Sequence, residues 1–338
     1  MRSIRPLARL AGCLAPLALL SACQSGDEIP ELTDEQRLGI YFENAMRYYN
    51  MRDLERAMHQ VRQGLSVDPN NERFELMEAK IYQLMGTTSD LARALYIYER
   101  HPAQDDFRIQ LGIGESNERL ALIEEASADA ISSGETFTSA PDPEARAQEL
   151  RKNAKKRLEK AYEAYLESND LMRGDVATIN GLVRVTALLA REHESIEWSR
   201  RLITVLSESS RVRRMELEEP DLGAGRERVL MAAIRANAAM TVETHLHVAD
   251  LYYMLDLKQE TIDELSRVVE LAPDESEAYG KRAQVLFELG RFQQASDSVQ
   301  RFLELSTDLP FDDPNIRKAF ELQSRCRAAL ADEGTPGL

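Results

Sequence analysis

Similar residues recur 34 positions apart near both ends of this 338-residue chain. In the C-terminal half, the recurring pairs are Ala249 and Ala283, Tyr252 and Leu286, Asp256 and Gly290, Thr261 and Ala295, and Leu265 and Val299. In the N-terminal half, they are Ala45 and Ala79, Tyr48 and Tyr82, and Arg52 and Gly86. This period is typical of stacked helical hairpins, because one hairpin cannot bury its apolar face without neighbours. The repeat therefore predicts an all-α chain built from pairs of helices.

The unit that begins at Ser276 shows the pattern most completely. Its small, large and turn-forming positions are Tyr279, Ala283, Leu286, Gly290, Phe292, Ala295 and Val299. The pattern resembles the tetratricopeptide repeat (TPR), in which small residues let two helices cross closely and a glycine permits the turn between them. The resemblance implies a TPR-like helix-turn-helix solenoid. The preceding unit departs from it, with Asp256 at the turn glycine and Lys258 at the next aromatic position.

Between the two ends the period is lost. We expect an N-terminal TPR pair at 34–102, irregular middle helices at 103–221 with a loop at 132–143, and a C-terminal TPR pair at 222–308. The loop is rich in Ser, Thr, Gly and Pro, which favour turns. Asp313-Pro314 suits a helix start, and an apolar stripe follows. Residues 309–338 are therefore predicted to be a capping helix and tail.

Two longer elements are expected inside or next to the middle region. Residues 176–206 resemble one more hairpin, and aligning Ala190 with the turn glycine places Ser195 and Trp198 at repeat positions. A helix is expected from Arg226 to Leu255, about 45 Å long at the usual rise per residue.

The N-terminus has the layout of a secretory signal. Arginines occupy positions 2, 5 and 9, and Leu10 to Leu20 is an apolar stretch shorter than the about 20 residues that span a bilayer. Leu20-Ser21-Ala22-Cys23 then resembles the bacterial lipobox. The resemblance implies that residues 1–22 are cleaved as a lipoprotein signal peptide.

Cys23 is the predicted lipidation site. Its thiol is the nucleophile that takes the lipid, and two or three acyl chains hold a protein stably at a membrane. Residues 23–33 are polar and suit a lipidated tether. In Gram-negative lipoproteins, an aspartate after the cysteine usually retains the protein in the inner membrane. Gln24 therefore favours the outer membrane, facing the periplasm, with the inner membrane as the alternative.

Charge and motif content exclude several functions. A net charge of −16 argues against nucleic-acid binding, which needs a basic surface. Three cysteines cannot form a disulfide framework. The sequence lacks the motifs of metalloproteases, α/β-hydrolases, nucleotide-binding loops and EF-hands. We therefore expect no catalytic residues and no cofactor.

Two charged patterns have both a binding and a structural interpretation. Glu243, His247 and Asp250 share a helix face and could supply three metal ligands, but a solvated polar face is the favoured interpretation, so no metal is expected. The basic run from Arg151 to Lys160 is interleaved with glutamates. It is interpreted as a salt-bridged helix rather than a contact to anionic lipid or an acidic partner.

A partner-binding groove is the functional site that the resemblance implies. In TPR proteins it is lined by the first helix of each repeat. The matching residues here are Phe42, Met46 and Tyr49 in the first repeat, Glu243, Leu246, Asp250 and Tyr253 in the third, and Glu277, Gln284 and Phe287 in the fourth. Aromatic side chains at such positions can anchor a peptide, or they can pack against a neighbouring helix. The sequence leaves both interpretations open.

The pattern as a whole favours a membrane-anchored, non-catalytic scaffold or adaptor that binds other proteins or peptides during assembly of the bacterial cell envelope. A passive spacer between membrane and cell wall is the alternative. An envelope enzyme or enzyme subunit without a recognisable motif is the less favoured third, because catalytic sites need convergent polar groups in a pocket. The partner and the oligomeric state are left open.

Overall fold

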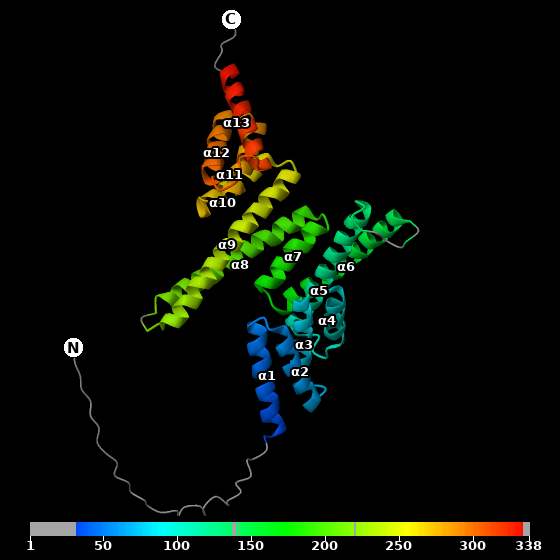
Figure 1. Ribbon diagram of the computed structural model, residues 1–338. Helices are drawn as coiled ribbons and strands as arrows, with labels where there is room; N and C mark the ends of the chain where they lie inside the picture. The colour runs from blue at the N-terminus through cyan, green and yellow to red at the C-terminus, as the bar shows by residue number, and fades with distance from the viewer. Residues whose placement is uncertain (1–31, 137–139, 141, 220, 334–338) are drawn as a thin grey trace, which may run out of the picture. The chain divides into compact units, whose positions relative to one another are not determined.

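The computed structural model describes residues 32–136, 140, 142–219 and 221–333, which form α-helices joined by turns (Figure 1). The helices of these residues are α1 Asp34–Asn50, α2 Leu54–Val67, α3 Glu72–Met85, α4 Thr88–Arg100, α5 Phe107–Ser132, α6 Pro143–Leu171, α7 Val176–Leu188, α8 Glu192–Leu217, α9 Ala224–Met254, α10 Lys258–Leu271, α11 Ser276–Glu288, α12 Phe292–Leu305 and α13 Pro314–Glu333. The all-α prediction is confirmed.

The chain divides into two compact units, Met1–Pro69 and Asn70–Leu338. The boundary falls between α2 and α3, inside the range 34–102 that the repeats group as one N-terminal pair. In the first unit, α1 packs against α2 and buries Ala45, Ala57 and Val61 completely. The second unit contains α3 to α13.

The turns between paired helices share one backbone feature. The first or second residue after the end of the first helix has a positive φ, a left-handed conformation that glycine adopts most readily. These residues are Arg52 (φ 60°), Gly86 (76°), Ala190 (54°), Asp256 (56°) and Gly290 (73°). Arg52 and Gly86 are 34 positions apart, as are Asp256 and Gly290. The same turn is therefore made by different residue types, and the fold is a TPR-like repeat.

In the second unit, consecutive helices form antiparallel pairs that stack in chain order. Helix α4 packs against α3 and α5, α6 packs against α5 and α7, and α8 packs against α7 and α9. Helices α5 and α6 have 26 and 29 residues, about twice the length of a repeat helix. Because of their length, the middle departs from the repeat pattern while keeping its order of packing.

Tyr165 fills the centre of this middle region. Its ring comes from α6 and lies between Gly114 of α5 and Gly181 of α7. A Cβ atom at either glycine would lie 2.7 Å or 2.5 Å from the Tyr165 ring, closer than any real Cβ contact. The two glycines therefore make the space in which the tyrosine is completely buried.

The hydroxyl of Tyr165 is part of a charged interior cluster. It donates to Glu118 Oε2 at 2.6 Å, and Arg184 of α7 donates to both oxygens of the same carboxylate. Burial raises the pKa of the Tyr165 hydroxyl, whereas the hydrogen bonds to Glu118 raise the pKa of the Arg184 guanidinium. The cluster connects α5, α6 and α7.

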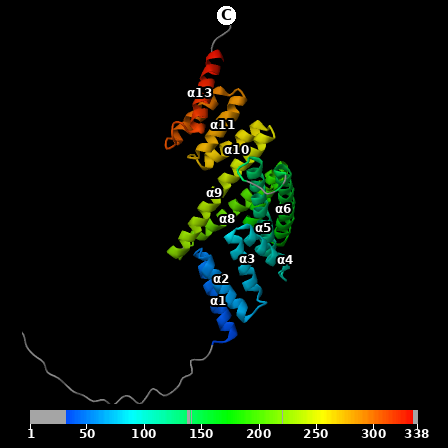
Figure 2. The same cartoon turned by 45° about the vertical axis from the view of Figure 1, so that its right-hand side comes forward.

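The hairpin of α8 and α9 links the middle to the C-terminal helices. Its helices have 26 and 31 residues and run side by side in Figures 1 and 2. Asn237 fixes their register, because its amide donates to the Leu206 carbonyl and to Ser210 Oγ. C-terminal to Asn237, α9 packs against α10, and His245 Nδ1 of α9 lies 2.6 Å from Glu264 Oε2 of α10.

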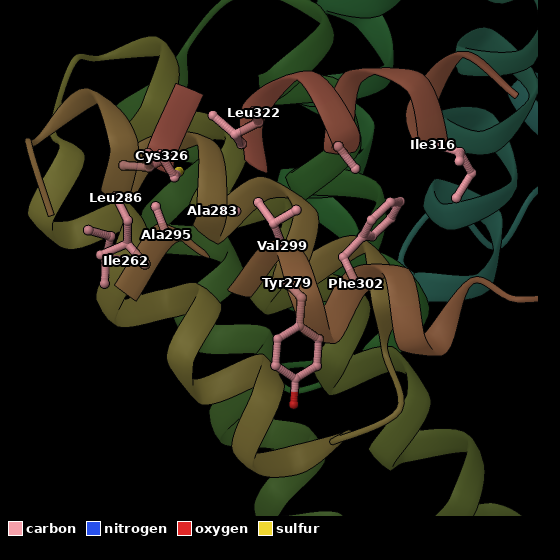
Figure 3. Packing of buried hydrophobic residues seen from close by; sticks show 12 residues of the cluster. Ile262, Tyr279, Ala283, Leu286, Ala295, Val299, Phe302, Ile316, Leu322 and Cys326 are labelled. Atoms are coloured by element: carbon pink, nitrogen blue, oxygen red, sulfur yellow. The ribbon is translucent and has the colours of Figure 1, made fainter. Parts of the chain in front are cut away.

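The C-terminal core is shared by four helices. Figure 3 shows Ile262 of α10, Leu286 of α11, Ala295 and Val299 of α12 and Cys326 of α13 packed together. Cys326 is completely buried and is not in a disulfide. Helix α13 thus covers the last repeat, as the capping prediction requires.

Candidate functional site

The residues expected to line a groove occupy equivalent places on α9 and α11. Glu243, Asp250 and Tyr253 are each 34 positions before Glu277, Gln284 and Phe287. All six lie on the first helices of the last two hairpins, and Glu243, Asp250, Glu277 and Gln284 are exposed. The structure therefore brings these residues to neighbouring helices, as the repeat register predicts.

Lys281 joins the two helices electrostatically. Its Nζ lies 2.7 Å from Asp250 Oδ1 on α9 and 2.8 Å from Glu277 Oε1 on its own helix. Burial lowers the pKa of Lys281, but the hydrogen bonds to Asp250 and Glu277 outweigh burial and raise it overall. Lys281 is not among the residues that the repeat register predicts, although it lies four positions after Glu277, the spacing at which helical ion pairs form.

The two aromatic residues of this face have different environments. Tyr253 is 44% exposed and its hydroxyl donates to Glu288 Oε1 at 2.9 Å. Phe287 is half-buried, with its ring centroid 5.3 Å from that of Phe292 and the Arg325 guanidinium 4.4 Å from its own. Phe287 therefore contacts two neighbouring helices, whereas the Tyr253 side chain is partly exposed.

On the first unit, Phe42, Met46 and Tyr49 lie along α1. Phe42 and Tyr49 are half-buried and Met46 is 36% exposed. Their binding role stays a prediction.

A groove with a volume of about 980 Å³ runs along α8 and α9 toward the turn between α10 and α11. Glu243 and Leu246 are the predicted site residues that line it. Its apolar lining consists of Leu206 and Met215 of α8, Ile234, Ala238, Ala239, Val242 and Leu246 of α9, and Leu271 and Ala272 at the end of α10. Four of these residues, from Ile234 to Leu246, follow one another at intervals of four and form a stripe about 18 Å long.

Charged side chains flank the apolar lining of this groove. Arg211 and Arg214 lie toward the α8–α9 turn, together with Glu218. Glu243 and Glu275 lie toward the turn between α10 and α11. An apolar floor with a charged rim is the usual composition of a protein-binding surface.

The repeat register does not indicate most of this groove. Met215 and Ser210 come from the part of α8 that exceeds the length of a repeat helix, and Leu271 and Ala272 from the end of α10. The register assigns the lining to first helices alone. The sequence after Leu206 gives little signal for them, because only Val212, Met215 and Leu217 are apolar in residues 207–219.

A second, smaller groove lies between α11, α12 and α13. It is lined by Glu277, Gln284, Lys281 and Lys318 above the buried side chains of Phe302 and Leu322. Glu277 and Gln284 are again residues that the repeat register selects. Four predicted site residues of the last two hairpins therefore line two different grooves, whereas Asp250, Tyr253 and Phe287 line neither of them.

The histidines of α9 serve packing contacts. His247 Nε2 lies 3.1 Å from Ser195 Oγ of α8. Burial lowers the pKa of this imidazole, and this effect outweighs the negative charges of Asp250 and Glu243, which raise the pKa. His245 is bound to Glu264, as described above. Within residues 32–136, 140, 142–219 and 221–333, no group of three or more His, Cys, Asp or Glu side chains is placed to hold a metal ion.

The basic run on α6 forms salt bridges with α5. Arg151 Nη2 lies 3.0 Å from Asp129 Oδ1, and Arg157 Nε lies 2.8 Å from Glu124 Oε1. These pairs hold α5 and α6 side by side, whereas the lysines between them are exposed.

The lipobox and Cys23 lie outside the described residues. None of the described helices combines the length and apolar character that crossing a membrane requires.

Comparison with known proteins adds structural likenesses. The sequence matches no protein-family model and no curated protein at a significant level. A thermophilic TPR protein from Thermus thermophilus is 12% identical over 75% of this chain and 100% of its own, with a TM-score of 0.41. The pilF protein of Pseudomonas aeruginosa is 12% identical over 85% of this chain and 98% of its own, with a TM-score of 0.45.

PilW, described as a widely conserved type IV pilus biogenesis factor, is 15% identical over 70% of this chain and 94% of its own, with a TM-score of 0.36. These likenesses concern the arrangement of the helices. The chain has a TPR-like repeat fold, an architecture that presents extended surfaces for binding other proteins.

Proposed function

We propose that this chain is a lipid-anchored, non-catalytic adaptor of the bacterial cell envelope, which binds segments of partner proteins in the groove of α8, α9 and the α10–α11 turn. The observation that carries this proposal is the partly exposed apolar stripe from Ile234 to Leu246, which lines the groove. Apolar side chains that are exposed to water cost free energy. A partner that covers them therefore gains binding free energy.

The shape and composition of the groove favour a protein ligand. Ala238 and Ala239 are exposed on the floor and lack long side chains, so a partner backbone can approach α9 closely. Leu271 is 56% exposed and Met215 also 56%, and both stand at the edge of this floor as apolar contacts. The rim charges Arg211, Glu243 and Glu275 supply orientation rather than catalysis.

The anchoring part of the proposal rests on the lipobox Leu20-Ser21-Ala22-Cys23 and on Gln24. In this proposal, Cys23 carries the acyl chains, residues 23–33 are the tether, and the adaptor faces the periplasm from the outer membrane. Mass spectrometry of the mature N-terminus tests the modification. Cys23→Ser should abolish both acylation and cleavage before residue 23, and an unmodified wild-type N-terminus would contradict the anchor without affecting the groove.

Site-specific photocrosslinking in a cell that expresses the full chain tests the groove. A photoreactive amino acid at Ala239 or Leu246 should give discrete crosslinked proteins. The same group at Ala236, exposed on α9 outside the groove lining, is the matched control. Equal products from Ala236 and Ala239 would contradict the groove assignment, and crosslinks to peptidoglycan or lipid alone would support a passive spacer instead.

A further inference from the structure

The α8–α9 hairpin has a second apolar side, opposite the groove. We name it the outer face and define it by Val205 and Val212 of α8 and Val229, Leu230 and Ala233 of α9. Groove residues and outer-face residues are offset by two positions along α8, which places them about 200° apart around the helix. The two surfaces therefore belong to opposite sides of one two-helix layer.

The outer face leaves large apolar side chains in water. Val212 is 52% exposed and Val229 is 59% exposed, while Leu230 is buried beneath them. The helices that pack against α8 are α7 and α9, and those that pack against α9 are α8 and α10. Two antiparallel helices bury only the side chains at their mutual contact. The apolar side chains that remain exposed on such a pair are buried when a second layer of helices packs against it.

The charge distribution indicates what that further layer is. Residues 207–235 contain six arginines and six carboxylates, so the whole net charge of −16 lies outside this segment. Two copies of a strongly acidic chain repel each other most where their surfaces are acidic and least where they are neutral. The hairpin is thus a segment on which two copies can approach each other without this repulsion, and it is one that also exposes large apolar side chains.

The acidic and basic side chains that line the outer face are also equal in number. Glu216 Oε1 lies 2.6 Å from Arg226 Nε, and the other charged residues that line this face are Glu208 and Arg213. The outer face thus carries two glutamates and two arginines. A second copy related by a twofold axis presents the same four residues, so the charges that line the contact sum to zero.

We propose that two copies of the chain associate through the outer faces of their α8–α9 hairpins, forming a four-helix bundle with the Val212 and Val229 side chains at its centre. The bundle buries the apolar surface that a single hairpin leaves exposed. The proposal is independent of the groove, which lies on the other side of the hairpin and stays open in the dimer.

Sedimentation velocity of the full chain tests the proposal. Cys23→Ser is included so that lipid cannot drive association. The chain should pass from a 38.3 kDa monomer to a dimer as its concentration rises from about 1 to about 100 µM. Val229→Glu and Val212→Glu should each raise the dimer dissociation constant at least about tenfold, because each buries a charge in the bundle.

Two matched controls place the interface. Leu188→Glu introduces the same charge at a 46% exposed position of α7, and Ala239→Glu introduces it on the groove floor. Neither should change the dissociation constant. Circular dichroism reports whether each variant folds, and Val229→Ser provides a milder change if Val229→Glu does not fold.

Three results would overturn the proposal. A chain that stays monomeric up to about 100 µM is not a dimer of this kind, and its outer face then serves a different protein. A dimer that is unaffected by folded Val229→Glu, Val229→Ser and Val212→Glu variants is held by another surface. A dimer that is weakened by Ala239→Glu or Leu188→Glu, and by neither valine substitution, places the contact on another face.

Discussion

The guanidinium of Arg184 binds the carboxylate of Glu118 through two parallel hydrogen bonds of 2.6 and 2.8 Å, although 66 positions separate the two residues. The Glu118 side chain is only 5% exposed and the Arg184 side chain is 45% exposed. One end of this ion pair is thus desolvated while the other reaches water. The pair fixes α7 against α5 at the centre of the second unit.

Arg184→Met should lower the free energy of unfolding by about 2 kcal/mol, since it leaves the Glu118 carboxylate buried with Tyr165 as its hydrogen-bond donor. The value is reduced from that of a fully buried pair because Arg184 is partly solvated. Urea denaturation measures it. Arg151→Met, which breaks exposed pairs, is the control and should cost no more than about 0.5 kcal/mol. Equal losses of unfolding free energy in the two variants would mean that the interior pair stabilises the fold no more than the exposed pairs do.

Gly181→Ala should destabilise the second unit by at least about 2 kcal/mol, because the added methyl group would lie 2.5 Å from the Tyr165 ring. Gly39→Ala is the matched control. Gly39 is in the interior of α1 with open space around it, so alanine there should stabilise by about 0.5–1 kcal/mol through its higher helix propensity. Opposite signs in thermal melts are expected, and a neutral Gly181→Ala would show that Tyr165 repacks freely.

Ala190→Gly should stabilise the chain by about 0.5–1 kcal/mol. Ala190 has a φ of 54°, and glycine removes the steric cost of this left-handed turn while losing more conformational entropy on folding. The reverse change, Gly290→Ala at the equivalent turn, should destabilise by about 1 kcal/mol. Chemical denaturation of both variants checks the pair, and a loss of stability in Ala190→Gly would contradict a strained turn.

His247 should make stability depend on pH. Burial lowers its pKa below the ordinary 6.5, so the unfolded chain binds this proton more tightly than the folded one. The contribution of His247 is therefore complete above pH 6.5 and is lost as the pH falls through 6.5 toward the lower folded value. His247→Gln should narrow the difference in melting temperature between about pH 7.5 and about pH 5.5, whereas the exposed His193→Gln should not. An unchanged difference in His247→Gln would contradict this assignment.

The repeat pattern predicted the helical hairpins because it records where helices must cross and turn. It also located a left-handed turn at Ala190, where the residue type alone gives no signal. It could not predict the length of α8, since the segment after Leu206 follows no repeat and its helix is held by contacts with α9. Composition predicted a loop at 132–143, and α5 ends at Ser132 while α6 begins at Pro143.

The candidate site was predicted in part. Repeat register selected Glu243 and Leu246, which do line the main groove, but not Met215 or Leu271, which reach it from second helices. The repeat register also could not distinguish aromatic residues that could anchor a peptide from those that pack against a neighbouring helix. Phe287 is held by Arg325, which belongs to a capping helix outside the repeat.

Helix α9 is a single continuous rod of 31 residues, about 46 Å long, and it is shared by two neighbouring pairings. Its first half belongs to the hairpin with α8, and its second half supports α10. A helix without a proline or an internal break has no hinge. The α8–α9 hairpin and the last two repeats are therefore built on one continuous helix axis.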